Sequence, residues 1–254
     1  MYLAIETSSL VSSIAIEHDH ILLGELTVQS GLTHSEQLVP HIQLLCEQVG
    51  IIPRQLDGIV VSIGPGSFTG LRIGMATAKS LAYALKKPLY GVMTMDALAY
   101  NLLYTNQLIS VVIDGQKKHV YEGLYRYEKG TLHCIQSPIL KVASDVINAY
   151  KDKNISVICI GDGIRRIQPF LSDDTPMITI APNSIQIPRA SSLFLAAKNR
   201  IDAHDSDDPM TMLPFYIKRS EAEVLWEAKH GTILENEENP TVIVSETVSL
   251  GEKS

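Results

Sequence analysis

Cysteine is scarce in this chain of 254 residues, which contains three: Cys46, Cys134 and Cys159. The count is odd and no CxxC spacing occurs, so neither a disulfide framework nor a zinc ribbon is expected. Cys159 lies within an apolar run at residues 155–160, where a cysteine is typically a small buried hydrophobe. This usage predicts a reducing compartment and a cytoplasmic protein.

Long apolar runs and an excess of basic residues are also missing. No stretch approaches the 18 or so apolar residues of a membrane span, and residues 1–6 meet an acid at once, which predicts a strand rather than a signal peptide. The net charge is −7, of which residues 231–254 supply −4 with five glutamates and one lysine. Neither part has the basic character that binds phosphate backbones, so we expect nucleic acid to be bound only with help from partners.

The common catalytic signatures are absent as well. The chain has no Walker A loop, no HExxH pair and no GxSxG elbow, and its eight histidines are scattered. We therefore expect no metal and no cofactor. What remains is an ordinary globular composition, with 45% apolar and 19% charged residues.

The order of predicted elements occurs twice, which favours an α/β protein made of duplicated lobes. Strands at 2–6, 11–17 and 21–29 precede a helix from Thr33 to Val49, where Thr33 and Glu36 match a capping box. A strand at 58–63 and a helix to about Leu85 follow. The second half repeats strand, hairpin, helix and strand, at 108–114, 119–136, 144–150 and 155–160. In this alignment of the halves, Glu6 corresponds to Asp114 and Gly64 to Gly161.

Residues 64–74 (GPGSFTGLRIG) are the most distinctive sequence motif in the chain. A strand leads into glycines and hydroxyl groups and then into a helix, an arrangement that can hold a phosphate at the helix N-terminus. A tight strand-to-helix turn that uses small residues for close packing explains the same pattern. Both interpretations remain open on the residues alone.

The helix after this loop has small residues every fourth position, at Gly70, Gly74, Ala78 and Ala82. Such a strip allows close approach of a second helix, either from a partner chain or from the chain's own sheet. The preceding helix has apolar residues on one face, at Leu38, Ile42 and Leu45. We predict that these seven residues form a partner interface.

Acids and glycines at the ends of strands suggest a second site, a candidate nucleotide cleft. Its predicted residues are Glu6 and Thr7 from the first half and Asp114, Gly161, Asp162 and Gly163 from the second. Strand-end acids that cap turns, and plain turns, are the competing interpretation.

Several segments together resemble the TsaB (YeaZ) family. They are the opening LAIETS at 3–8, HSEQLVP at 34–40, the GPGSFTGLRIG loop, ATAK at 76–79, Gly91-Val92 with Asp96-Ala97-Leu98, the GDG turn at 161–163, and PFYIKRSEAE at 214–223. The resemblance covers roughly residues 1–230. Glu6 departs from it, because the family usually has Asp there, and the acidic tail has no counterpart.

The resemblance implies an ASKHA (actin-like ATPase) fold with two ribonuclease-H-like lobes and mixed sheets. It implies an N-terminal lobe at 1–105, a C-terminal lobe at 106–230 and a tail at 231–254, expected to be mobile or to add an edge strand at Thr241–Ser245. It further implies partnership with TsaD, through the first two helices, and with the ATPase TsaE. Together these proteins transfer a threonylcarbamoyl group from threonylcarbamoyl-AMP to N6 of adenosine 37 in ANN-decoding tRNAs. Alone, the chain is expected to form a homodimer.

One departure from the catalytic relative argues against catalysis by this chain. TsaD holds its metal with two histidines in a GVxHxxAH-like stretch, and the comparable stretch here has Thr94 and Leu98 at those places. Leucine cannot ligate a metal. The resemblance therefore implies a non-catalytic scaffold, while a small-molecule kinase and a metalloprotease-like enzyme remain alternatives.

Overall fold

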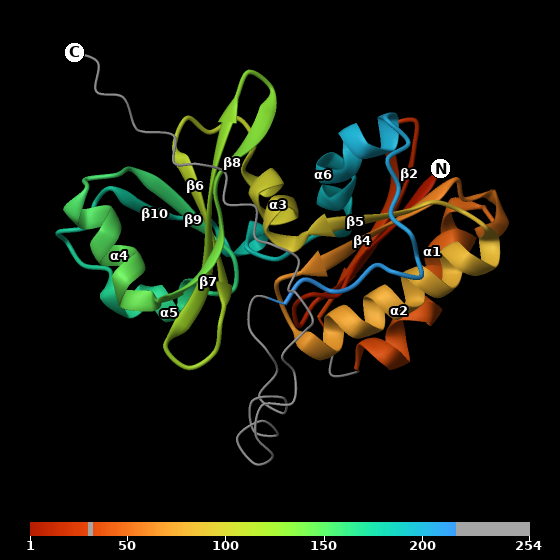
Figure 1. Ribbon diagram of the computed structural model, residues 1–254, viewed down its shortest axis with the longest axis horizontal. Helices are drawn as coiled ribbons and strands as arrows, with labels where there is room; N and C mark the ends of the chain where they lie inside the picture. The colour runs from red at the N-terminus through yellow and green to blue at the C-terminus, as the bar shows by residue number, and fades with distance from the viewer. Residues whose placement is uncertain (30–32, 217–254) are drawn as a thin grey trace. The chain divides into compact units, whose positions relative to one another are not determined.

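The computed structural model describes residues 1–29 and 33–216 and contains two five-stranded mixed sheets, one from each half of the chain (Figure 1). The first sheet has the order β3-β2-β1-β4-β5, in which β1 pairs antiparallel with β2 and parallel with β4. Its strands are β1 (Tyr2–Glu6), β2 (Ser12–His18), β3 (Ile21–Val28), β4 (Gly58–Gly64) and β5 (Leu89–Met93).

The second sheet repeats this plan in the order β10-β9-β6-β7-β8. The strand β6 pairs antiparallel with β7 and parallel with β9, as β1 does with its two neighbours. In each half, the fourth strand along the chain ends at or just before a glycine with positive φ. This φ is 116° at Gly64, the end of β4, and 117° at Gly161, just after β9. The strands are β6 (Leu108–Asp114), β7 (His119–Glu128), β8 (Thr131–Val142), β9 (Val157–Ile160) and β10 (Ile178–Ile180).

Helices cover both faces of the first sheet because every second residue of its strands points to the same side. Leu3 and Ile5 pack in the core formed with α1 (His34–Val49) and α2 (Phe68–Leu85). Ala4, between them, packs in the core formed with α6 (Ala190–Asp202). Figure 1 shows α1 and α2 side by side on one face and α6 on the other.

The second sheet is covered in the same manner. Val112 packs with α4 (Ala143–Asp152) and α5 (Ile164–Ile167), whereas Val111 and Ile113 pack with α3 (Thr94–Ala99). Four 3-10 turns complete the described part of the chain, at Pro53–Gln55, Tyr100–Leu102, Gln168–Phe170 and Asn183–Ile185. The predicted ASKHA-type fold, with two α/β lobes and mixed sheets, is confirmed.

Local signals in α1 act as the sequence predicts. Thr33 and Glu36 form the capping box, and Gly50 ends the helix in the left-handed region at φ 76°. The helix runs through Pro40. The lobe boundaries at residues 105 and 230 stay a prediction, and the proposed edge strand at Thr241–Ser245 and the acidic tail lie outside the described residues.

Candidate functional site

The glycine-rich loop between β4 and α2 packs on the chain's own backbone. Ser67 donates its N–H to the carbonyl of Ser8 at 2.6 Å and caps α2, since its side chain accepts from the Gly70 N–H at 3.2 Å. A Cβ added at Gly66 would lie 2.3 Å from the Ser8 carbonyl oxygen. These contacts make glycine necessary for close packing, which favours the tight-turn interpretation of residues 64–70.

The small-residue strip of α2 faces the same turn. A Cβ at Gly70 would lie 2.0 Å from the carbonyl oxygen of Thr7, and one at Gly74 would lie 2.1 Å from Thr7 Oγ1. That hydroxyl donates to the Gly70 carbonyl at 2.8 Å. Further along the helix, Ala78 and Ala82 are buried in the first core. The close approach predicted for this strip is made to the chain's own first strand and turn.

The apolar face of α1 is also internal. Leu38, Ile42 and Leu45 are 1%, 5% and 7% exposed and belong to the same core. These three side chains are therefore part of the chain's own core, and other residues of the same two helices point outward. These residues are Val39, Gln43, Leu44 and Glu47 on α1 and Arg72, Ala76, Ser80 and Tyr83 on α2. They are called the outer face below.

Glu6 ends β1 as a fully buried carboxylate. Its Oε1 accepts the N–H of Ser8 at 2.6 Å, while its Oε2 has no hydrogen-bond partner in the described part of the chain. Burial raises the pKa of the Glu6 carboxyl, and the hydrogen bond from the Ser8 N–H offsets this only in part. Among the described residues no ion pair compensates this carboxyl, so its charged form is costly to bury.

Asp114, at the matching end of β6, has different surroundings. Arg165 and Arg166 of α5 both donate to its carboxylate, and Arg166 Nε lies 3.1 Å from Oδ1. Burial acts to raise the pKa of Asp114, but the bonds from Arg166 and Arg165 outweigh it and the pKa is lowered. The second-half acid is thus neutralised by two arginines, a contact that the sequence interpretation missed.

The GDG turn packs against β6. A Cβ at Gly161 would lie 2.3 Å from the Val112 carbonyl oxygen, and one at Gly163 would lie 2.9 Å from the backbone carbon of the same residue. Asp162 Oδ1 accepts the N–H of Asp114 at 2.9 Å. Burial raises the pKa of Asp162, while the bond from the Asp114 N–H opposes it. Both glycines are therefore explained by close backbone contact.

Residues from the two halves meet at one small cavity of about 10 Å³, room for about one water molecule. Asp162 is the only residue of the predicted cleft that lines it; Glu6, Thr7, Asp114, Gly161 and Gly163 do not. Its lining residues are Ser8, Ser9, Thr94, Leu98, Ile113, Asp162 and Pro188. This small cavity therefore does not bring the predicted cleft residues together.

Thr94 and Leu98, the two positions that the family resemblance compares with metal-binding histidines, lie on α3 and are each 1% exposed. The Thr94 hydroxyl is buried and has no hydrogen-bond partner among the described residues. Within residues 1–29 and 33–216, no group of three or more His, Cys, Asp or Glu side chains is placed to hold a metal ion. No helix of this part is long and apolar enough to cross a membrane.

Comparisons with known proteins show the family. The family model described as "TsaD: tRNA N6-adenosine threonylcarbamoyltransferase" matches residues 29–226. The tRNA threonylcarbamoyladenosine biosynthesis protein TsaB of Bacillus subtilis (strain 168) is 30% identical over 88% of this chain and 96% of its own length. The protein of the same name from Buchnera aphidicola subsp. Schizaphis graminum (strain Sg) is 28% identical over 65% of this chain and 80% of its own.

A solved structure supports the fold. The structure titled "YeaZ from Pseudomonas aeruginosa" superposes with a TM-score of 0.73 at 22% identity, covering 85% of this chain and 98% of that one. The duplicated strand order, the loop packed on Thr7 and Ser8, and the near full-length match to the Bacillus protein agree with one another. This chain belongs to the TsaB (YeaZ) family.

Proposed function

We propose that this chain is a non-catalytic partner in the modification of tRNA with threonylcarbamoyladenosine. In this proposal it works with a TsaD-type threonylcarbamoyltransferase and the ATPase TsaE. These transfer a threonylcarbamoyl group from threonylcarbamoyl-AMP to N6 of adenosine 37 in ANN-decoding tRNAs. Family membership supports the pathway, since the relatives from Bacillus and Buchnera carry it in their names.

The observation that supports the non-catalytic role is the identity and burial of two residues on α3. A metal-binding site needs side chains with free lone pairs that reach a common point. Here the two relevant positions are Thr94 and Leu98, both buried in the protein interior. The metalloprotease alternative needs the same missing ligands. The absence of metal and cofactor remains a prediction.

The kinase alternative is also disfavoured by the strand-end acids. An ATP site of this architecture needs charged groups that face an open cleft. Glu6 is fully buried, and Asp114 binds two arginines. Hydrolysis of ATP by the purified chain alone would contradict the scaffold proposal and favour the kinase.

The outer face of α1 and α2 is the surface that we assign to the partner. It presents three large apolar side chains to solvent, Val39 at 50%, Leu44 at 45% and Tyr83 at 73% exposure. On α2, the small exposed residues Ala76 and Ser80 leave room for a second pair of helices to approach. An apolar and small-residue face of this kind fits a helix pair of TsaD, and a second copy of this chain when TsaD is absent.

Charge supports an indirect role for tRNA. The net charge is −7, and affinity for nucleic acid depends largely on phosphate neutralisation by lysine and arginine. We expect little binding of free tRNA by the chain alone at physiological salt in a gel-shift assay. Tight binding without partners would contradict this part of the proposal. The predicted cytoplasmic location stays a prediction.

The decisive experiment places a large charged side chain on the outer face. Ala76 is exposed, so the Ala76→Arg variant should keep the thermal stability of the wild type. Its binding to TsaD should weaken by about ten-fold or more, the equivalent of ~1.4 kcal/mol. The tRNA modification, measured by mass spectrometry of digested tRNA, should fall with it. The matched control is Ala203→Arg, the same change at an exposed alanine beyond α6. A folded Ala76→Arg protein that binds TsaD with wild-type affinity would refute this interface.

A further inference from the structure

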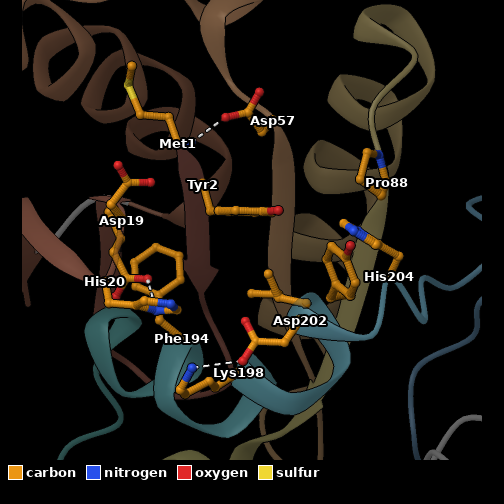
Figure 2. A pocket seen from close by; sticks show the side chains of 13 residues that line it. Met1, Tyr2, Asp19, His20, Asp57, Pro88, Phe194, Lys198, Asp202 and His204 are labelled. Carbon is orange, nitrogen blue, oxygen red and sulfur yellow. Dashed lines mark hydrogen bonds and ion pairs between the residues drawn. The ribbon is translucent and has the colours of Figure 1, made fainter.

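Two cavities of very different size lie near opposite ends of β1. A cavity of about 630 Å³ lies where Tyr2 begins the strand, and Figure 2 shows two of its carboxylates, Asp57 and Asp202, bonded to Met1 and Lys198. None of the side chains that line it has a buried polar atom without a hydrogen-bond partner in the described part of the chain. The lining of this larger cavity therefore does not call for a ligand.

The small cavity beyond the other end of β1 differs in this respect. Its volume is about 10 Å³, room for about one water molecule, and both Ser8 and Thr94 line it. Ser8 is 3% exposed and Thr94 is 1% exposed, and each hydroxyl oxygen is buried without a hydrogen-bond partner among the described residues. Buried polar groups normally have a partner. Two such hydroxyls at one cavity point to a polar ligand.

The backbone of Ser8 is held in place by hydrogen bonds on both sides. Its N–H donates to Glu6 Oε1 at 2.6 Å, and its carbonyl accepts the N–H of Ser67 at 2.6 Å. These two bonds fix Ser8 in the turn between β1 and β2, against the glycine-rich loop. The position of the Ser8 hydroxyl is thus set by backbone contacts, although the hydroxyl itself bonds to none of the described residues.

Thr94 is the first residue of α3, a place where a hydroxyl often bonds to nearby backbone. The N-cap residue is Met93, which makes no side-chain cap bond, and the Thr94 hydroxyl bonds to no described group. Leu98, four residues later, lines the same cavity. Because residues four apart share one face of a helix, this face of α3 is turned toward the cavity.

The size of the cavity and the polar groups of its lining select the ligand. In a space that holds one water molecule, every lining residue lies close to the same central molecule. A buried water makes two to four hydrogen bonds, and the two hydroxyls and the Asp162 carboxylate of this lining supply three. A metal ion is not supported, because the described residues include no group of three or more His, Cys, Asp or Glu side chains that could hold one.

We propose that this cavity binds one structural water molecule that links the turn after β1 to α3. The hydroxyls of Ser8 and Thr94 donate to the water oxygen, and the water donates to the Asp162 carboxylate. Ser8 belongs to the first half of the chain and Asp162 to the second, while α3 packs on the second sheet. One water thus satisfies two buried hydroxyls and joins the two halves at one point.

Thermal unfolding of two variants of the full chain tests this site. Thr94→Val keeps the branched shape of the side chain and removes the hydroxyl, and Ser8→Ala does the same for the other partner. Each should lower the melting temperature by about 2–4 °C, because a hydrogen bond to the water is lost. The matched control is Ser12→Ala: the Ser12 hydroxyl is also buried without a described partner, but Ser12 does not line this cavity. That change should keep or raise the melting temperature.

The double variant tests whether one water serves both hydroxyls. Its melting temperature should fall by less than the sum of the two single shifts, because the first change already weakens binding of the shared water. Additive shifts would overturn the proposal, as would a Thr94→Val protein that melts at or above the wild-type temperature.

A high-resolution crystal structure of the wild-type chain gives a test that needs no variant. We expect a density peak about 2.5–3.0 Å from both Ser8 Oγ and Thr94 Oγ1. Absence of a peak bonded to both oxygens would overturn the proposal, and so would shorter contacts of about 2.3–2.6 Å to six or more oxygens, which identify a cation. None of these outcomes bears on the TsaD interface, because Ala76 does not line the cavity.

Discussion

Replacing Gly70 with alanine tests whether the small-residue strip of α2 serves the chain's own fold. The new methyl carbon would be built 2.0 Å from the carbonyl oxygen of Thr7. Carbon and carbonyl oxygen ordinarily approach to about 3.3 Å, so helix and turn have to separate by roughly 1.3 Å. The obstructing atom belongs to the backbone, and rotation of a side chain cannot relieve the contact.

The expected cost follows from two opposing effects. Overpacking in a tight interior typically costs about 1–3 kcal/mol, whereas alanine gains about 0.5–1 kcal/mol over glycine in a helix. That gain is small here, because Gly70 lies in the first turn of α2. We expect a net loss of about 1–2 kcal/mol and a fall in melting temperature of roughly 3–6 °C.

Differential scanning calorimetry measures this shift, with Ser80→Ala as the control. Ser80 lies exposed on the same helix, so its replacement should change stability by less than about 0.5 kcal/mol. The reasoning would be refuted by a Gly70→Ala protein that melts at or above the wild-type temperature. That result would mean that α2 can leave the Thr7 turn at no cost, as it could if the strip faced a partner.

Three further predictions concern the strand-end residues. Because burial raises the pKa of Glu6, the folded state binds more protons than the unfolded state above the ordinary value of 4.5, and stability falls as pH rises from there. Glu6→Gln should remove this fall in urea unfolding series and be more stable than wild type at neutral pH; an unchanged pH profile would contradict it. Asp114 has a lowered pKa, so its stabilising contribution is present above 3.8 and lost as pH falls through the folded value. Asp114→Asn should therefore cost about 1 kcal/mol at neutral pH, measured by urea unfolding, and equal stability would argue against the arginine contacts. Gly161→Ala, at φ 117° and 2.3 Å from the Val112 carbonyl, should lower stability by about 3 kcal/mol or more, and a soluble variant with a wild-type melting temperature would refute this.

Elements with strong local signals were predictable from the sequence. The strand Tyr2–Glu6 and the capped helix ending at Val49 have the predicted ends, because alternation, the Thr33–Glu36 box and Gly50 act within a few residues. The helix α6 was missed. It has no predicted cap, and its role in covering the first sheet depends on strands more than a hundred residues earlier in the chain.

For the candidate sites too, local features were predictable from the sequence and long-range contacts were not. Gly70 and Gly74 were identified as places of close approach, and that much is correct. Their neighbour, the Thr7 turn, follows β1 and lies about 60 residues away in the chain, so periodicity could not distinguish it from a partner helix. The partner interface itself stays a prediction, moved to the outer face.

By itself, the sequence determined the α/β class, the duplicated order of strands, the family, and the absence of histidine at positions 94 and 98, which are Thr94 and Leu98. These are properties of residue identity and of spacing along one strand, turn or helix. Only the tertiary structure decided which face of α2 is buried, that Asp114 binds two arginines, and that Ser8 and Thr94 line one cavity. The physical reason is that burial, pKa and cavity shape depend on atoms from residues that are far apart in the chain. The local sequence does not identify those neighbours.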